Sequence, residues 1–292
     1  MKRWLPALLC LLFSAPLLAG GVSGVRKTAV GSMLVTGWIE VAPTGKVQHY
    51  ELDQPSKLPS TVTELINQAV SGWMFEPVLI AGKPVLAKAH MSLRVIAKPV
   101  EEGYYQVKIT GAEFGAPQGK GQIDTDSPSE KHTVAPAYPS EAAASGVSGT
   151  VYVLMMINHQ GRVEQDLAQQ VDLRVAATDT QMQEFRKILA SAATRALKRW
   201  TFNIPTTGPK AAAPYWYARV PITFTLNNQR VPGYGHWDVY IPGPVETAPW
   251  LIRQLPGIGN DKLIIANVDS TQSGGNFSLT NGLHLISALS GS

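Results

Sequence analysis

A tryptophan followed two residues later by a phenylalanine occurs twice, each time after an amphipathic stretch, and these two motifs constrain the fold most. They are Trp73-Met74-Phe75 and Trp200-Thr201-Phe202. Apolar residues before each motif recur every three or four positions, the period of a helix with one buried face. After each tryptophan the period changes to two, which places both rings on one side of a strand and in the core. The sequence therefore predicts a helix that leads directly into a strand, present twice.

The pattern around the first motif predicts a small antiparallel sheet. Strands are expected at residues 33–41, 46–52 and 85–96, with a further strand at 104–109. The helix lies between the second and third strands, and Thr61 with Glu64 is expected to form a capping box at its start.

The second motif lies in a similar succession of elements. A short helix is expected at residues 140–144, followed by strands at 150–157 and 162–175 and a long helix capped by Thr180 with Gln183. A final strand is expected at residues 215–226. Pro221 has no N–H to donate, so this strand is predicted to have one free edge.

The free edge supplies the candidate protein-binding site. An incoming strand satisfies the unpaired backbone groups that such an edge presents. Ordinary packing is the alternative role for the aromatic residues here. The candidate protein-binding residues are Tyr215, Tyr217, Arg219, Thr223 and Thr225.

The predicted fold class is α+β, with two small units that each pack an antiparallel sheet on a helix. The expected division places the first unit at residues 30–111, a flexible linker at 112–133, the second unit at 134–227 and an irregular tail at 228–292. Residues 263–268 are a strand candidate within the tail, and the last twenty residues are expected to be mobile.

The N-terminal residues 1–20 have the pattern of a cleavable signal peptide. Lys2 and Arg3 precede an apolar run, and small residues follow at Ala19 and Gly20. The expected location is therefore the periplasm, with a retained inner-membrane anchor as the alternative. The single cysteine, Cys10, lies within this segment, so the mature chain is expected to have neither disulfides nor thiol chemistry.

Composition and motif content argue against several classes of function. Without Lys2 and Arg3 there are 23 basic and 21 acidic residues, a net charge of +2, and no basic cluster that would indicate nucleic-acid binding. The six histidines have no metal-binding spacing, and no nucleophile elbow or complete dinucleotide motif is present. We therefore expect a protein that is not an enzyme and that has no cofactor or metal.

The second unit carries a series of residues that is typical of one known family. The series is Pro136, Tyr138, Pro139, Ala142, Gly146, Gly149, Val151, Val153, Gly161, Val163, Ala192, Ala193, Ala196, Trp200, Phe202, Pro205, Gly208, Val220, Pro221, Ile222, Phe224 and Leu226. Through these residues, the segment 134–226 resembles the C-terminal domain of the TonB family. Residues 33–97 resemble a reduced copy, through Gly37, Ile39, Val41, Gly45, Val47, Trp73, Phe75, Pro77, Gly82 and Pro84.

The resemblance implies a protein-binding domain that is often dimeric. Members of the family bind outer-membrane receptors, in some cases by adding an extended peptide to a sheet edge, which connects this chain with TonB-dependent transport. The chain departs from the anchored transducers, because its apolar start has no histidine and only about a dozen residues, roughly 45 Å when extended, separate the signal segment from the first strand. A membrane-anchored energy transducer and a self-assembling structural envelope protein remain the alternative functions.

Overall fold

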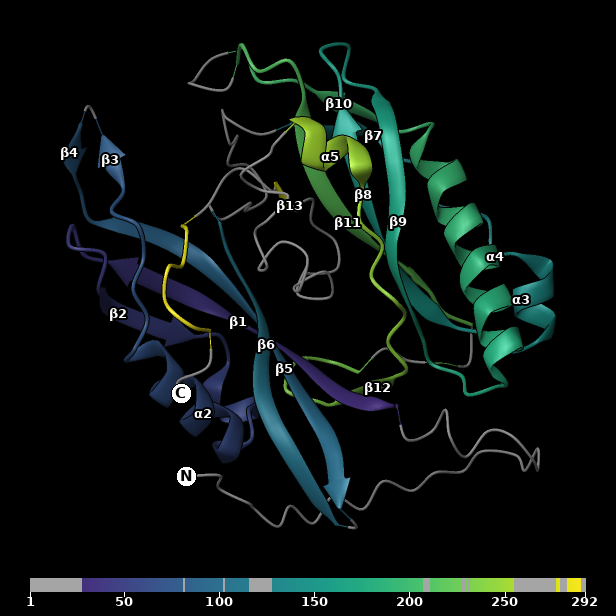
Figure 1. Cartoon of the computed structure of the whole chain (residues 1–292), viewed down its shortest axis with the longest axis horizontal. Coiled ribbons are helices and arrows are strands. Elements are labelled where there is room, and N and C mark those ends of the chain that lie inside the picture. The colour runs from purple at the N-terminus through teal and green to yellow at the C-terminus, as the bar shows by residue number, and fades with distance from the viewer. Residues whose placement is uncertain are drawn as a thin grey trace.

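Two antiparallel sheets, each with helices on one face, form the structure (Figure 1). This computed structural model describes residues 28–80, 82–101, 103–115, 128–206, 211–226, 229, 232–254, 277–278 and 283–289. The predicted α+β class is confirmed. The signal peptide predicted at residues 1–20 and the strand predicted at 263–268 lie outside the described residues.

The first sheet has the strand order β12-β1-β5-β6, and β2 also pairs with β1. Its strands are β1 Val30–Val41, β2 Val47–Leu52, β5 Ala87–Glu101, β6 Tyr104–Gly115 and β12 Asp238–Tyr240. The short helix η1 Pro55–Lys57 and the helix α2 Ser60–Val70 follow β2, and α2 packs on the face that carries Met33, Val35 and Ile39. A small hairpin of β3 Leu79–Ile80 and β4 Lys83–Pro84 extends away from this sheet (Figure 1).

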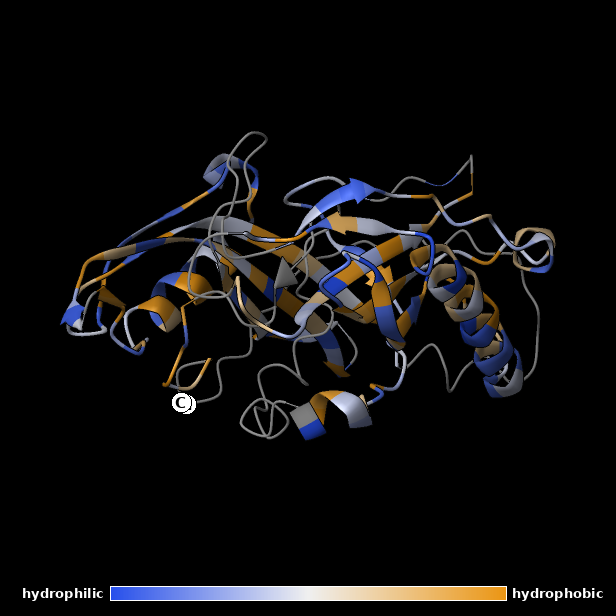
Figure 2. Cartoon of the chain, turned by 90° about the horizontal axis from the view of Figure 1, so that it is seen from above, coloured by the Kyte–Doolittle hydropathy of each residue, from blue (hydrophilic) through white to orange (hydrophobic). Residues whose placement is uncertain are grey.

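The second sheet has the strand order β13-β11-β8-β9. Its strands are β8 Gly149–Ile157, β9 Val163–Leu173, β11 Trp216–Phe224 and β13 Phe277–Ser278. The helices α3 Ser140–Ala144 and α4 Asp179–Leu197 cover one face (Figure 1). Apolar residues concentrate along the central strands, and hydrophilic residues lie on the outer side of α4 (Figure 2). This distribution is the amphipathic pattern that predicted the helix.

The sheet faces that the helices leave uncovered look toward each other. Helix α5 Pro249–Gln254 packs against Leu154, Met156 and Tyr217 on this side of the second sheet. An ion pair from Arg219 of β11 to Glu113 of β6 joins the two faces directly. The sheets therefore form two layers with α2, α3 and α4 on the outside, and α5 and a polar contact on the inner side.

The hairpins β1–β2 and β8–β9 have the same local geometry. Gly45 and Gly161 both have a positive φ, 85° and 70°. The carbonyl of Gly45 accepts a hydrogen bond from the N–H of Phe75 at 2.8 Å, and that of Gly161 accepts one from Phe202 at 2.8 Å. A larger residue does not fit at either position, because a Cβ on Gly45 would lie 2.1 Å from the carbonyl oxygen of Phe75, and a Cβ on Gly161 would lie 2.1 Å from that of Phe202.

The two predicted capping boxes are wrong in position. Helix α2 begins after Pro59, which offers no side-chain cap, so Thr61 lies inside the first turn. Helix α4 does have a capping box, but it is formed by Thr178 and Gln181, two residues before the predicted pair. Threonine is followed by glutamine at the same spacing from both Thr178 and Thr180, so the sequence pattern alone did not distinguish them.

Part of the predicted linker is ordered secondary structure. Residues 112–115 complete β6, and β7 Ser129–His132 is a strand that pairs with β10 Thr201–Asn203. The indole N–H of Trp200 donates a hydrogen bond to the carbonyl of Val134 at 2.9 Å, just after β7. A polar strand without apolar alternation gave no sequence signal for this pairing.

The described part of the predicted irregular tail contains three short regular elements, β12, α5 and β13, between irregular segments. β12 joins the first sheet and β13 joins the second. Residues 283–289, expected to be mobile, run beside the segment between α2 and β3 (yellow in Figure 1), and Leu285 is buried in the first core. Within the described residues, no helix is long and apolar enough to cross a membrane.

Candidate functional site

β11 provides the candidate binding edge of the second sheet. One side of β11 pairs with β8 over nine residues, whereas β13 covers only Ala218 and Arg219 on the other side. The predicted edge is thus not free at these two residues. From Val220 to Phe224, β8 is the only strand paired with β11 among the described residues.

Pro221 fixes which backbone groups point outward. Pro221 lies opposite Tyr152 of β8 and has no N–H to donate to it. Hydrogen-bonded and non-hydrogen-bonded pairs alternate along an antiparallel ladder, so the backbone groups of Arg219, Pro221 and Thr223 point toward the outer edge. The pairing of Arg219 with Phe277 of β13 agrees with this direction. On the part of the outer edge that β13 does not cover, the carbonyl of Pro221 and the backbone N–H and carbonyl of Thr223 therefore point outward.

The two tyrosines among the candidate residues contact the chain itself. The Tyr217 ring stacks on Trp250 of α5 with 6.1 Å between ring centroids, and burial together with nearby Tyr215 raises the pKa of Tyr217. The hydroxyl of Tyr215, a half-buried residue, donates a hydrogen bond to Glu164 at 3.3 Å. Helix α5 therefore covers this end of the predicted site.

Arg219 is the most deeply buried candidate residue, with 1% of its surface exposed. Its Nε donates a hydrogen bond to Oε1 of Gln169 at 3.0 Å, and its Nη1 lies 3.8 Å from a carboxylate oxygen of Glu113. Glu113 and Gln169 are also buried. The Arg219 side chain thus connects the second sheet to the first, and any partner at this strand would meet its backbone.

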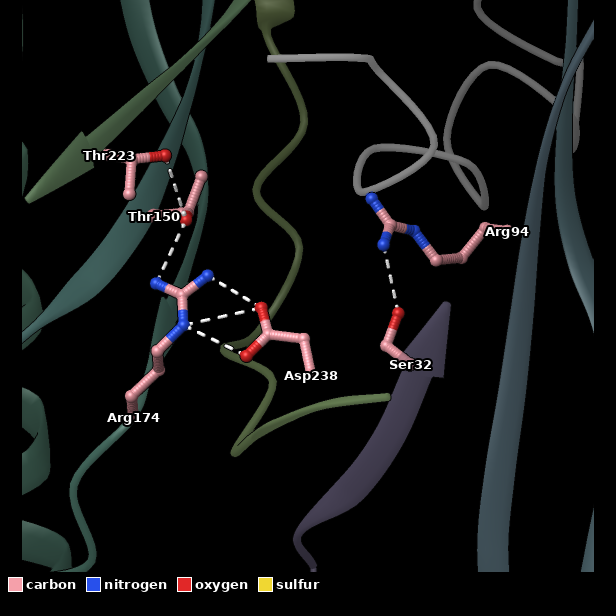
Figure 3. A network of polar contacts seen from close by, with 6 residues as sticks. All are labelled: Ser32, Arg94, Thr150, Arg174, Thr223 and Asp238. Carbon is pink, nitrogen blue, oxygen red and sulfur yellow. Dashed lines mark hydrogen bonds and ion pairs between the residues drawn. The ribbon is translucent and has the colours of Figure 1, made fainter. Parts of the chain in front are cut away.

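Thr223 and Thr225 lie at the more accessible end of β11. The Thr223 hydroxyl is 3.3 Å from that of Thr150 on β8 (Figure 3), and Thr223 is half-buried. Thr225 follows the last residue of the strand and is exposed. Of the five candidate residues, only Thr225 presents its side chain freely to solvent.

A second ion pair joins the two sheets close to Thr150. The Arg174 guanidinium, after β9, donates to both carboxylate oxygens of Asp238 at 2.6–3.2 Å, while Arg94 donates to Ser32 at 2.9 Å (Figure 3). Burial alone would lower the pKa of Arg174, but its hydrogen bond and charge interaction with Asp238 outweigh burial and raise it. The Arg174–Asp238 pair therefore joins the two layers, whereas the bond between Arg94 and Ser32 lies within the first sheet.

Trp73, Phe75, Trp200 and Phe202 are core residues, as predicted. Each is less than 9% exposed, and each pair lies in the hydrophobic cluster of its own sheet. Within the described residues, no group of three or more His, Cys, Asp or Glu side chains could hold a metal ion. The polar contacts between the sheets were not predicted, because strand alternation does not reveal what covers the second face of a sheet.

The comparisons leave the relationship to other proteins at the level of the sequence resemblance. No known protein family, curated protein or solved structure matches this chain.

Proposed function

We propose that this chain is a periplasmic protein-binding protein, not an enzyme, that takes up an extended peptide on the outer edge of β11. The observation that carries the proposal is the outward-facing backbone of Pro221 and Thr223, in a stretch of β11 that is paired with β8 alone among the described residues. An extended peptide would satisfy these groups with main-chain hydrogen bonds, and its side chains would supply specificity.

β13 already pairs with Ala218 and Arg219, next to the proposed site, and this pairing also supports strand addition as the mode of binding. β13 holds only two residue pairs with β11, so the chain itself adds a short strand at the proposed site. A longer peptide along Ala218–Phe224 would replace β13 and gain further pairs. We therefore expect β13 to compete with the partner.

The resemblance to the TonB C-terminal domain supports the choice of partner. Both Trp-x-Phe motifs follow a helix and contact the turn glycine of a hairpin in the same way, as expected for two related units. A partner from the outer membrane or periplasm, acting in TonB-dependent transport, is consistent with the signal-like residues 1–20. A homodimer is also consistent with this family.

A photo-crosslinking amino acid at Thr225 provides the test, because this residue is exposed beside the proposed edge. The full chain would be expressed with its signal segment, irradiated in cells, and its crosslinked partners identified by mass spectrometry. We expect a discrete partner that Thr223→Pro abolishes, since proline removes an outward N–H without affecting the β8 ladder.

Thr223→Val is the matched control, because it keeps the backbone N–H and the size of the side chain. It should retain the crosslink, and both variants should keep the thermal unfolding profile of the parent chain. If Thr223→Pro folds normally and still gives the same crosslinked partner, binding at this edge is refuted.

A further inference from the structure

The C-terminal segment, residues 283–289, is hydrogen-bonded to residues 73–76, between α2 and β3. Leu285 forms an antiparallel bridge with Phe75. The N–H of Ile286 donates to the carbonyl of Met74 at 2.8 Å, and the N–H of Glu76 donates to the carbonyl of His284 at 2.9 Å. Leu285 is 4% exposed and belongs to the first core. The edge of residues 73–76 therefore binds an extended chain.

A hydrogen bond from the motif tryptophan completes the binding of this segment. The indole N–H of Trp73 donates to the carbonyl of Leu289 at 3.0 Å, four residues beyond Leu285. The segment is thus held at both ends: by the backbone of residues 74–76 and by a buried indole.

The edge of the second Trp-x-Phe motif binds its strand in the same manner. Glu130 of β7 lies opposite Phe202, and the indole of Trp200 donates to the carbonyl of Val134, again four residues further on. The two bound segments have different sequences, Ser-Glu-Lys-His-Thr-Val and His-Leu-Ile-Ser-Ala-Leu. The spacing agrees although the side chains differ, so main-chain contacts are common to both edges. At the first edge the buried Leu285 side chain and the Ser287 hydroxyl, which accepts a hydrogen bond from the N–H of Met74 at 3.0 Å, add side-chain contacts.

We propose that the edge of residues 73–76 also accepts the C-terminal segment of a second copy of this chain, so that two copies exchange segments and form a dimer. The second copy offers the same Leu285, Ile286 and Leu289, and every contact observed within one chain would form again between two. The proposal does not depend on peptide binding at β11.

The position of the segment near the end of the chain makes this exchange possible. Leu283 is separated from Gln254, the last residue of α5, by residues 255–282, a stretch of 28 residues that spans at most roughly 95 Å. β13 lies in this stretch and has two residue pairs to give up. A neighbouring copy is therefore within reach.

Cysteine pairs in the full chain test the exchange. Met74 and Ile286 lie opposite each other in the antiparallel pairing, at a spacing that suits a disulfide. Two variants, Met74→Cys and Ile286→Cys, would each carry Cys10→Ala to remove the only native cysteine. One variant carries a heavy-nitrogen label, and the pair is mixed under native conditions, oxidised and mapped by mass spectrometry.

We expect a disulfide between the labelled and unlabelled copies that joins positions 74 and 286, in a yield that rises with protein concentration. Ile252→Cys is the matched control, since it changes another exposed isoleucine, on α5, and should give no such link with Met74→Cys. The double variant, with both cysteines in one chain, should close within a single copy. If it closes and the mixed variants give no link between copies, the exchange is refuted; if it does not close, the contact itself is refuted.

Discussion

Arg219→Met should be the most damaging single change at the contact between the sheets. The substitution retains most of the aliphatic stem and removes the guanidinium, which is 1% exposed and bound to Gln169 and Glu113. The Glu113 carboxylate, 7% exposed, then loses its cation while it remains buried. Breaking a buried ion pair from one side typically costs about 3–5 kcal/mol.

The expected loss is large compared with the stability of an ordinary domain. Proteins unfold with roughly 5–15 kcal/mol, so the variant should lose a quarter or more of its free energy of unfolding. At about 2–4 °C per kcal/mol for a chain of this size, a loss of about 4 kcal/mol corresponds to a fall in Tm of roughly 8–16 °C.

Urea unfolding followed by circular dichroism and tryptophan fluorescence measures this effect. The control is Glu113→Gln in the Arg219→Met background, which removes the buried negative charge and should restore part of the loss. Neighbouring residues of this kind couple by about 0.5–3 kcal/mol in a double-mutant cycle. A loss below about 1 kcal/mol for Arg219→Met, or no coupling in the cycle, would contradict the structural role of this pair.

Three further predictions test other parts of the structure. Trp200→Ala should lower the free energy of unfolding by about 3–5 kcal/mol in urea titration, and normal stability with loss of partner binding would contradict its core role. Gly45→Ala and Gly161→Ala should each cost more than the about 1–2 kcal/mol of a left-handed backbone alone; Gly82→Ala, at φ 78° with no atom within 4 Å of its Cβ, measures that smaller cost separately. Asp166→Asn should raise the free energy of unfolding at pH 7, since burial, offset only in part by a nearby lysine, raises the pKa of this carboxyl and makes its charged form unfavourable in the folded state. This gain should disappear as the pH falls through the raised pKa toward the ordinary value of 3.8, and a gain that persists there would contradict it.

Local periodicity was sufficient to predict most of the regular elements. The helix before each Trp-x-Phe motif was predicted correctly, because its period arises from a single buried face within a short stretch. The strand predicted after the helix forms only at the second motif, as β10, whereas Met74 and Phe75 make isolated bridges. The strands at residues 33–41 and 150–157 follow from the same signal. Helix starts were less accurate, since two threonines near α4 offered equivalent capping patterns.

Contacts between distant segments were not visible in the sequence. β7, β12 and β13 are two to four residues long, too short for a periodic signal, and each is fixed by a partner strand far away in the chain. The burial of Arg219 has the same origin. Alternation places it on one face of β11 but does not reveal that a second sheet covers that face.

The tail contacts several strands at the edges of the two sheets. β12 covers the first residues of β1, Ile241 pairs with Leu173 at the end of β9, and the N–H of Glu246 donates to Gln169. Unpaired edges are sites of unwanted association, so these contacts protect the fold. They also decide what a partner must overcome: peptide binding at β11 has to displace β13, and exchange between copies has to release residues 283–289. Leu285→Ala weakens the same contact in the closed monomer and in the exchanged dimer, so we expect it to speed exchange between copies without raising the dimer fraction, measured by light scattering across a concentration series and over time after dilution. A higher dimer fraction in a folded Leu285→Ala chain would show that the segment blocks association at this edge and is not itself exchanged.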